Sequence, residues 1–252
     1  MVKKIIVTGS NGRFAQELKK IKNRYNFIFR NKKQLNILSI QSIEKNIKRF
    51  RPKYILHLAG LSRPMSIHDN KINQSIDLNI IGTCNLVKIC NLKKIKLIFF
   101  STSYVYPGQK GNYKETDPVL PWNNYGWSKL AAESAVQMYK NSLIIRACMT
   151  EKPFIHKYAY SNVKSNFIFH DEIANIFLKV INKKGVINIG GKSQTIYKFA
   201  KKHRSNIKKK ISKGEFPKKM DMNLNKLKKI LKKWKYIKQN FKTYWSLNKK
   251  II

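Results

Sequence analysis

The stretch IIVTGSNGRFA, residues 5–15, joins a short apolar run to an amphipathic segment through a loop that contains two glycines. The apolar run is typical of a buried strand, and the segment after it predicts a helix. Glycines in such a loop allow a tight turn and a close approach of the backbone to a pyrophosphate, which the helix N-terminus also attracts. A strand-to-helix turn can need glycine for its geometry alone, but the position directly after a strand favours a dinucleotide site. The predicted contacts of this loop are Gly9, Ser10, Asn11, Gly12, Arg13 and Phe14.

The rest of the chain alternates short apolar runs with longer amphipathic segments. This alternation predicts an α/β protein with a doubly wound parallel sheet, a Rossmann fold. We expect a dinucleotide-binding domain over residues 1–146. Residues 147–252 are expected to form a small C-terminal substrate lobe and a basic helix, interleaved with the first domain. Expected strands are 5–8, 27–29, 54–58, 97–100, 143–145 and 186–189; expected helices are 12–21, 40–50, 72–91, 124–139, 169–180 and 195–203. An apolar stripe of Leu224, Leu227, Ile230, Leu231 and Trp234 predicts that the final helix docks onto the body.

The second expected strand indicates which dinucleotide binds. NAD sites normally carry an Asp or Glu about 20 residues after the glycine loop, which accepts hydrogen bonds from ribose hydroxyls. This chain has no acidic residue between Glu17 and Glu44, and the strand ends at Arg30. A guanidinium there can pair with a 2′-phosphate. Because basic residues are common throughout the chain, the missing acid is the stronger half of the argument, and it favours NADP(H) over NAD(H).

The net charge of the chain is extreme. Its 252 residues include 53 Lys and Arg against 12 Asp and Glu, which gives +41. Such a charge would suggest nucleic acid or an anionic membrane surface as a partner. The basic residues are spread over the whole chain, however, and are only somewhat denser beyond residue 200. We therefore interpret the charge as compositional drift and expect no nucleic-acid partner.

The three cysteines, Cys84, Cys90 and Cys148, have no metal-ligand spacing, and an odd number argues against a disulfide framework. We expect no metal site and a reducing compartment. No stretch approaches the roughly 18 apolar residues of a membrane span, and the apolar run at the amino end is too short for a signal peptide. These features predict a cytoplasmic protein without membrane contact.

Tyr125 and Lys129 lie on the helix expected after the strand that ends in Ser101-Thr102-Ser103. Residues four apart share a helix face, and an ammonium beside a phenol lowers the pKa of the phenol. Tyr125 is therefore predicted to exchange a proton near neutral pH, with Thr102 bonded to the same substrate oxygen. Only this pair follows a strand-end hydroxyl, although the spacing alone is weak evidence in a lysine-rich chain. It recurs at Tyr106 and Lys110, Tyr160 and Lys164, and Tyr197 and Lys201.

Taken together, the motifs resemble the extended short-chain dehydrogenase/reductase family, in the branch that acts on nucleotide sugars. Within it, the chain is most similar to the dTDP-4-dehydrorhamnose reductase-like group. The resemblance covers most of the chain. Its motifs are Thr8-Gly9-x-x-Gly12, Leu58-Ala59-Gly60, Asn79-x-x-Gly82-Thr83, Ser101-Thr102-Ser103-Tyr104-Val105-Tyr106, Glu115-Thr116-Asp117-Pro118, Tyr125-x-x-x-Lys129, Phe169-His170-Asp171-Glu172-Ile173-Ala174 and Asn188-Ile189-Gly190-Gly191.

The resemblance implies roles for individual residues. Thr102, Tyr125 and Lys129 would be the catalytic triad, and Lys129 and Tyr125 would also hold the cofactor. Asn79 would be a helix-packing amide or a member of a proton relay, while His57 and His170 are interpreted as structural. Further cofactor contacts would be Ala59, Gly60, Asn79 and Ser101, and the substrate would meet Ser103, Tyr104 and Cys148.

The resemblance also separates reaction types. Dehydratases of the family carry an Asp-Glu pair where this chain has Ser103-Tyr104, which disfavours dehydration. The implied activity is an NADP-dependent oxidoreductase that reduces a keto group of a nucleotide-activated deoxysugar. The alternatives are an epimerase with bound NAD, which the missing strand-two acid disfavours, and a non-catalytic protein that binds NADP or a polyanion. The segment 146–169 is shorter than in most of the family, so we expect a reduced substrate lobe. A homodimer is compatible with this interpretation.

Overall fold

The computed structural model describes residues 2–233. A six-stranded sheet with the order β10-β5-β4-β3-β1-β2 forms its centre, and every strand pair in it is parallel. The predicted doubly wound fold is therefore confirmed. The strands are β1 (Lys4–Thr8), β2 (Asn26–Arg30), β3 (Tyr54–His57), β4 (Lys96–Thr102), β5 (Ser142–Ala147) and β10 (Gly185–Ile189).

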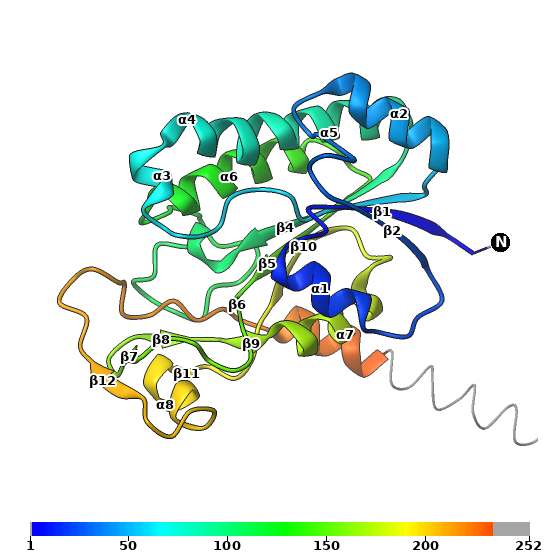
Figure 1. The fold of residues 1–252 in the computed structure, drawn as a ribbon. Coiled ribbons are helices and arrows are strands. Elements are labelled where there is room, and N and C mark those ends of the chain that lie inside the picture. Colours follow the sequence, from blue (N-terminus) through cyan, green and yellow to red (C-terminus); the bar gives the residue numbers. More distant parts are fainter. Residues whose placement is uncertain (1, 234–252) are drawn as a thin grey trace, which may run out of the picture.

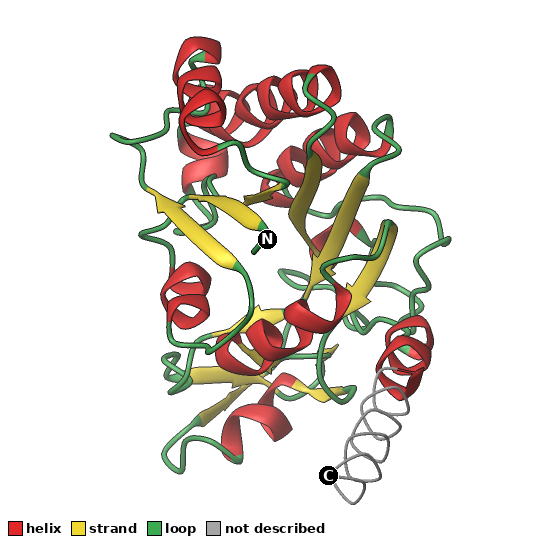
Figure 2. Ribbon diagram, turned by 90° about the vertical axis from the view of Figure 1, so that its right-hand side faces the viewer, coloured by secondary structure: helices red, strands yellow, loops and turns green. Residues whose placement is uncertain are grey.

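Helices cover both faces of this sheet, because alternate strand residues point to opposite sides. Ile5 and Val7 of β1 pack in one apolar core with α1 (Arg13–Lys19) and α7 (His170–Val180). Ile6 between them packs in a second core on the other face. That face is covered by α2 (Ile40–Phe50), α5 (Gly82–Leu92) and α6 (Asn124–Gln137), as Figure 1 shows. In Figure 2 the central strands lie between the two groups of helices.

The expected helix over 72–91 is divided. It comprises α4 (Ile72–Ser75), a π-helical turn η1 (Ile76–Ile81) and α5. A short helix α3 (Ile67–Asn70), which was not predicted, precedes it. Such π turns inside helices are frequent at functional sites, and this one holds Asn79.

The small lobe lies beyond the carboxyl ends of the strands of the central sheet (Figure 1). It has its own core, which includes Phe154, Val163, Phe199 and Met220. Strand β10 and helix α7, both from beyond residue 146, belong to the central sheet and its α1 face. The short elements of this region are β6 (Met149–Thr150), β7 (Tyr158–Tyr160), β8 (Lys164–Ser165), β9 (Ile168–Phe169), β11 (Gln194–Thr195), α8 (Ile196–Lys201) and β12 (Lys208–Lys210).

The predicted docking of the final helix is confirmed for the described part. Residues 225–233 are helical, Leu227 is buried in the core of the α1 face, and Ile230 and Leu231 pack against that core. Trp234 lies outside the described residues. Within residues 2–233, helices long and apolar enough to cross a bilayer are absent.

Candidate functional site

The glycine loop has the tight geometry that the sequence predicts. Gly9 has φ +68°, and a Cβ atom added there would lie 2.6 Å from the backbone nitrogen of Ala59. The next turn closes with a hydrogen bond from the Gly12 N–H to the Gly9 carbonyl, at 2.9 Å. A side chain at Gly9 would therefore strain the loop and push apart the ends of β1 and β3. The loop leads into the N-terminus of α1, where backbone N–H groups favour an anion.

The residues of this loop that were predicted to contact a cofactor differ in burial and in their contacts. The Phe14 side chain is buried, with its ring centroid 4.6 Å from that of Phe100, so this side chain belongs to the apolar core. Asn11 is exposed, Ser10 is buried, and the Ser10 N–H donates to the carbonyl of Arg30 at 3.1 Å. Arg13 is exposed and forms an ion pair with Glu151. The first two strands are thus joined at the point where a dinucleotide would cross them.

Arg30 lies at the carboxyl end of β2, beside Arg49. Its guanidinium carbon lies 4.3 Å from the centre of the Phe50 ring, so the charged plane is held against an aromatic face. The Nε of Arg30 is buried and has no hydrogen-bond partner within the described chain. Burial, followed by the charge of Arg49, lowers the pKa of Arg30. An unpartnered donor beside a second guanidinium fits an anionic group such as a 2′-phosphate.

Two members of the predicted triad, Thr102 and Tyr125, meet at the carboxyl end of β4. Asn123 caps α6 by accepting from the Gly126 N–H at 2.8 Å, which starts the helix just before Tyr125 reaches the cavity wall. Thr102 hydrogen-bonds the phenol of Tyr125. Lys129, one turn further along α6, is only 9% exposed, and its Nζ lies 4.1 Å from the centre of the Phe99 ring.

The predicted lowering of the phenol pKa is wrong. Burial raises the pKa of Tyr125 to about 12, although the hydrogen bond from Thr102 and the charge of Arg63 oppose the rise. Burial also lowers the pKa of Lys129 to about 7, against the attraction of Glu133. Sequence spacing places the lysine and the tyrosine on one helix face, but it does not reveal that both groups are desolvated. The cation that acts on Tyr125 here is Arg63.

The other tyrosines with the same spacing have different surroundings. Tyr106 is buried, and its hydroxyl contacts Asn188 at 2.9 Å and Arg146 at 2.8 Å. Arg146 pairs in turn with the fully buried Glu133 of α6, which anchors that helix to β5. Tyr160 does line the cavity, but its hydroxyl donates to Glu215 at 3.2 Å. Tyr197 lies on α8 and packs against the core of the small lobe.

A directed chain of hydrogen bonds fixes His57. The Thr83 hydroxyl donates to the carbonyl of Asn79 at 2.6 Å, so it accepts from His57 Nε2 at 3.0 Å. His57 Nδ1 must then accept from the Thr8 hydroxyl, at 2.9 Å. Burial, aided by the charge of Lys129, lowers the pKa of His57 to about 3. The ring is therefore neutral and ties Thr8 of β1 to Thr83 at the start of α5, in line with a structural role.

The Asn79 side chain extends this chain of bonds to the catalytic helix. Its amide accepts from the Leu61 N–H at 2.7 Å and donates to the Leu61 carbonyl at 3.1 Å and to Ser128 Oγ at 2.9 Å. Ser128 donates to the carbonyl of Tyr125 at 2.8 Å. Gly60, with φ +149°, lies so close that an added Cβ would be 2.7 Å from Asn79 Oδ1. Both amide N–H groups are used, which favours the helix-packing role of Asn79.

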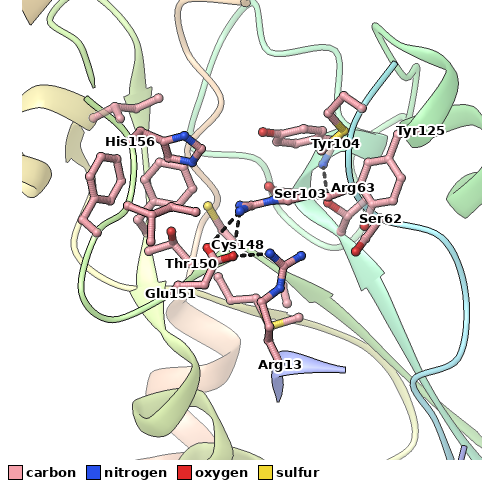
Figure 3. A pocket seen from close by; sticks show the side chains of 18 of the residues that line it. Arg13, Ser62, Arg63, Ser103, Tyr104, Tyr125, Cys148, Thr150, Glu151 and His156 are labelled. Carbon is pink, nitrogen blue, oxygen red and sulfur yellow. Dashed lines mark hydrogen bonds and ion pairs between the residues drawn. The ribbon is translucent and has the colours of Figure 1, made fainter. Parts of the chain in front are cut away.

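A cavity of about 800 Å³ opens in front of Thr102 and Tyr125 (Figure 3). Ser103, Tyr104 and Cys148, the predicted substrate contacts, line it. Ser101 also lines it, and its buried hydroxyl has no partner among the described residues. The opposite wall comes from the small lobe and is aromatic, with Phe154, Tyr158, Tyr160, Phe167 and Phe216. Cavities of this size and composition suit a small molecule with apolar faces.

Two features of the site were missed by the sequence analysis. Arg63, Glu151 and Arg13 meet inside the cavity, and His68 packs against Tyr125 with ring centroids 5.0 Å apart. His68 is buried, its Nδ1 lies 2.8 Å from Ser75 Oγ, and its Nε2 has no partner among the described residues. For Glu151, the only feature of the sequence that could have indicated a role is the scarcity of acidic residues, 12 in the whole chain. In residues 2–233, clusters of His, Cys, Asp or Glu that could hold a metal are absent.

Known proteins similar to this chain include methionine adenosyltransferase 2 subunit beta and dTDP-4-dehydrorhamnose reductase. It is 30% identical over 143 residues to methionine adenosyltransferase 2 subunit beta of Pongo abelii, over 53% of this chain and 42% of that protein. It is 26% identical over 152 residues to dTDP-4-dehydrorhamnose reductase of Aggregatibacter actinomycetemcomitans, over 58% of this chain and 51% of that protein. The matched region thus spans about half the length of these curated relatives.

Solved structures share the fold over most of the chain. dTDP-4-dehydrorhamnose reductase from Bacillus anthracis str. Ames, solved in complex with NADP, superimposes with a TM-score of 0.81 at 24% identity, over 90% of this chain and 92% of that one. UDP-glucose 4-epimerase of Thermus thermophilus, solved with NAD, gives 0.71 at 15% identity, over 89% and 91%.

The model of the RmlD substrate binding domain family matches residues 3–151 of this chain. These residues are more than half of the chain, and they include the glycine loop, Arg30, Asn79 and the triad. The resemblance inferred from the motifs is thereby confirmed. The chain belongs to the RmlD substrate binding domain family.

Proposed function

We propose that this protein is an NADP-dependent oxidoreductase that reduces a keto group of a nucleotide-activated deoxysugar, with Tyr125 as proton donor. The observation that supports it most is the hydrogen bond between Thr102 and Tyr125 at the end of β4, on the wall of a cavity that opens beside the glycine loop, with the buried Lys129 one turn further along α6. Reductases of this kind among the similar proteins support the substrate class.

The cofactor would lie across the carboxyl ends of β1, β3 and β4. The glycine loop and the N-terminus of α1 would hold its pyrophosphate, Arg30 its 2′-phosphate, and the unpartnered Ser101 hydroxyl its nicotinamide end. When bound, NADPH supplies the hydride that reduces the carbonyl carbon. NADP in the Bacillus anthracis neighbour supports this assignment.

Tyr125 has the protonation state that reduction requires. With a pKa of about 12, its phenol keeps its proton at neutral pH and can donate it to the carbonyl oxygen as charge develops there. Thr102 holds the phenol in place and can bond the same oxygen. The phenolate left behind would be costly in this buried site, and the positive charge of Arg63 would offset part of that cost.

A second candidate is a non-catalytic NADP-binding subunit on the same fold. It is favoured by the higher identity to methionine adenosyltransferase 2 subunit beta than to the reductase. Epimerisation with bound NAD is less compatible with the basic end of β2.

The test is NADPH oxidation by the purified protein, followed at the nicotinamide absorbance, with a panel of 4-keto nucleotide sugars that begins with dTDP-4-dehydrorhamnose. The proposal expects turnover with at least one of them and product with a new hydroxyl group by mass spectrometry. NADPH binding without turnover of any panel member would favour the subunit instead.

A further inference from the structure

Three charged side chains from separate segments meet in the middle of the cavity. Arg63, from the loop after β3, reaches across it, and its Nη1 lies 2.7 Å and 2.9 Å from the two carboxylate oxygens of Glu151. Arg13, at the start of α1, pairs with the same carboxylate. Figure 3 shows both guanidiniums pointing at Glu151. Glu151 directly follows β6, so the bridge joins the sheet half to the small lobe.

The charge in this cavity contrasts with the charge of the whole protein. The chain carries +41, yet the charged side chains that line the cavity in the described part of the chain are Arg13, Arg63 and Glu151. Burial opposes ionisation of Glu151, but the two arginines and a backbone N–H hold the pKa of its carboxyl below the ordinary value. Glu151 is therefore an anion, 13% exposed, with two cations. The Glu151 carboxylate therefore keeps one ion pair if either Arg13 or Arg63 moves away.

Arg63 is the member that faces the reaction centre. Its side chain is 33% exposed, and its charge opposes the rise that burial causes in the pKa values of Tyr125 and Tyr104. A ligand in front of the proton donor would thus lie within reach of this guanidinium. Guanidinium groups bind carboxylate and phosphate with the same bidentate geometry, which makes the two anions natural competitors for one arginine.

Resting on the proposed function, we propose that Arg63 is the receptor for the diphosphate of the substrate and that it exchanges Glu151 for a phosphate oxygen. Arg13 keeps Glu151 paired during the exchange, which avoids an uncompensated buried carboxylate. Glu151 then acts as an internal competitor, weakening the binding of anionic ligands and holding Arg63 in place without one.

The test measures binding rather than turnover. Thymidine diphosphate is titrated into the protein saturated with NADP⁺, by calorimetry, for the parent, Arg63→Gln and Glu151→Gln. We expect Arg63→Gln to weaken binding at least tenfold, and Glu151→Gln to tighten it at least threefold, because the competing anion is gone. Arg24→Gln and Glu44→Gln, at exposed positions outside the cavity, control for the change in net charge.

If the ion pairs of Glu151 only hold the sheet half and the small lobe together, Glu151→Gln should weaken the binding of thymidine diphosphate instead of tightening it. Both variants would then weaken binding, and that result would overturn the proposal, as would unchanged binding in Arg63→Gln. Arg63→Lys, which keeps the charge and loses the fork, should bind between the parent and Arg63→Gln. Circular dichroism and melting of each variant separate loss of folding from loss of binding.

Thymidine without phosphates separates this proposal from the proposed function. Its affinity, measured in the same way, should not change in either variant, because it has no anion for Arg63. If thymidine diphosphate follows the expected pattern while no keto sugar is reduced, the diphosphate site stands and the reductase fails. If reduction occurs but the diphosphate affinity ignores Arg63, the reductase stands and the diphosphate site fails.

Discussion

Removal of the buried charge at Lys129 should stabilise the protein, and by an amount that depends on pH. The unfolded chain keeps the ordinary lysine pKa of 10.5, whereas burial lowers it to about 7 in the folded state. Between these values the unfolded state binds more protons than the folded state, so the stability of the parent rises with pH. The Lys129→Met variant lacks this pH-dependent contribution to the free energy of unfolding. The stability advantage of the variant should therefore shrink by about 2 kcal/mol between pH 7 and pH 9.

The assay is urea unfolding without cofactor, followed by tryptophan fluorescence at several pH values. Only the difference between the free energies of unfolding of parent and variant is used, because the contributions of titratable groups that both proteins share then cancel. Lys88→Met, at an exposed position of α5, controls for the loss of a lysine as such. A Lys129→Met difference that stays constant from pH 7 to pH 9 would refute the reasoning, since the ammonium would then be as well solvated in the folded state as in the unfolded one.

Three further predictions concern the cofactor and the charge. NADPH should bind at least several-fold more tightly than NADH, and Arg30→Asp should narrow this ratio in fluorescence titrations; equal affinities in the parent would contradict the 2′-phosphate assignment. Gly9→Ala should cost about 1–3 kcal/mol in backbone strain and weaken NADPH binding at least tenfold, and a variant with parental affinity would contradict the described loop. Replacement of the exposed Lys228 and Lys229 by Ser should leave turnover unchanged, whereas tight DNA binding at physiological salt with a steep salt dependence would favour a polyanion function.

The central strands of the sheet are predictable because parallel strands buried on both faces are continuous apolar runs. Leu97–Phe100 and Leu143–Ile145 have no alternation to confuse with a surface strand, and both lie inside the strands of the structure. The division of the helix over 72–91 is not predictable in this way. Its π turn depends on contacts of Asn79 with Leu61 and Ser128, which are tertiary and leave no local pattern.

The site is predictable to the extent that it is built from local motifs. The glycine loop, and Thr102 before Tyr125 and Lys129, follow from the order of strands and helices. The pKa of Tyr125 does not, because desolvation depends on what packs around the ring. Arg63 and Glu151 belong to segments far apart in the chain, and each is unremarkable in sequence, so their pairing required the structure.

The central claim, that Tyr125 gives the proton, is tested most directly by single-turnover NADPH oxidation with a 4-keto nucleotide sugar. Tyr125→Phe keeps the ring and removes the hydroxyl, and Tyr106→Phe, Tyr160→Phe and Tyr197→Phe serve as matched controls with the same lysine spacing. The account predicts that Tyr125→Phe keeps its NADPH affinity and loses roughly 10²–10⁴ in rate, while the control variants still reduce the substrate. Reduction by Tyr125→Phe at the parental rate would contradict it.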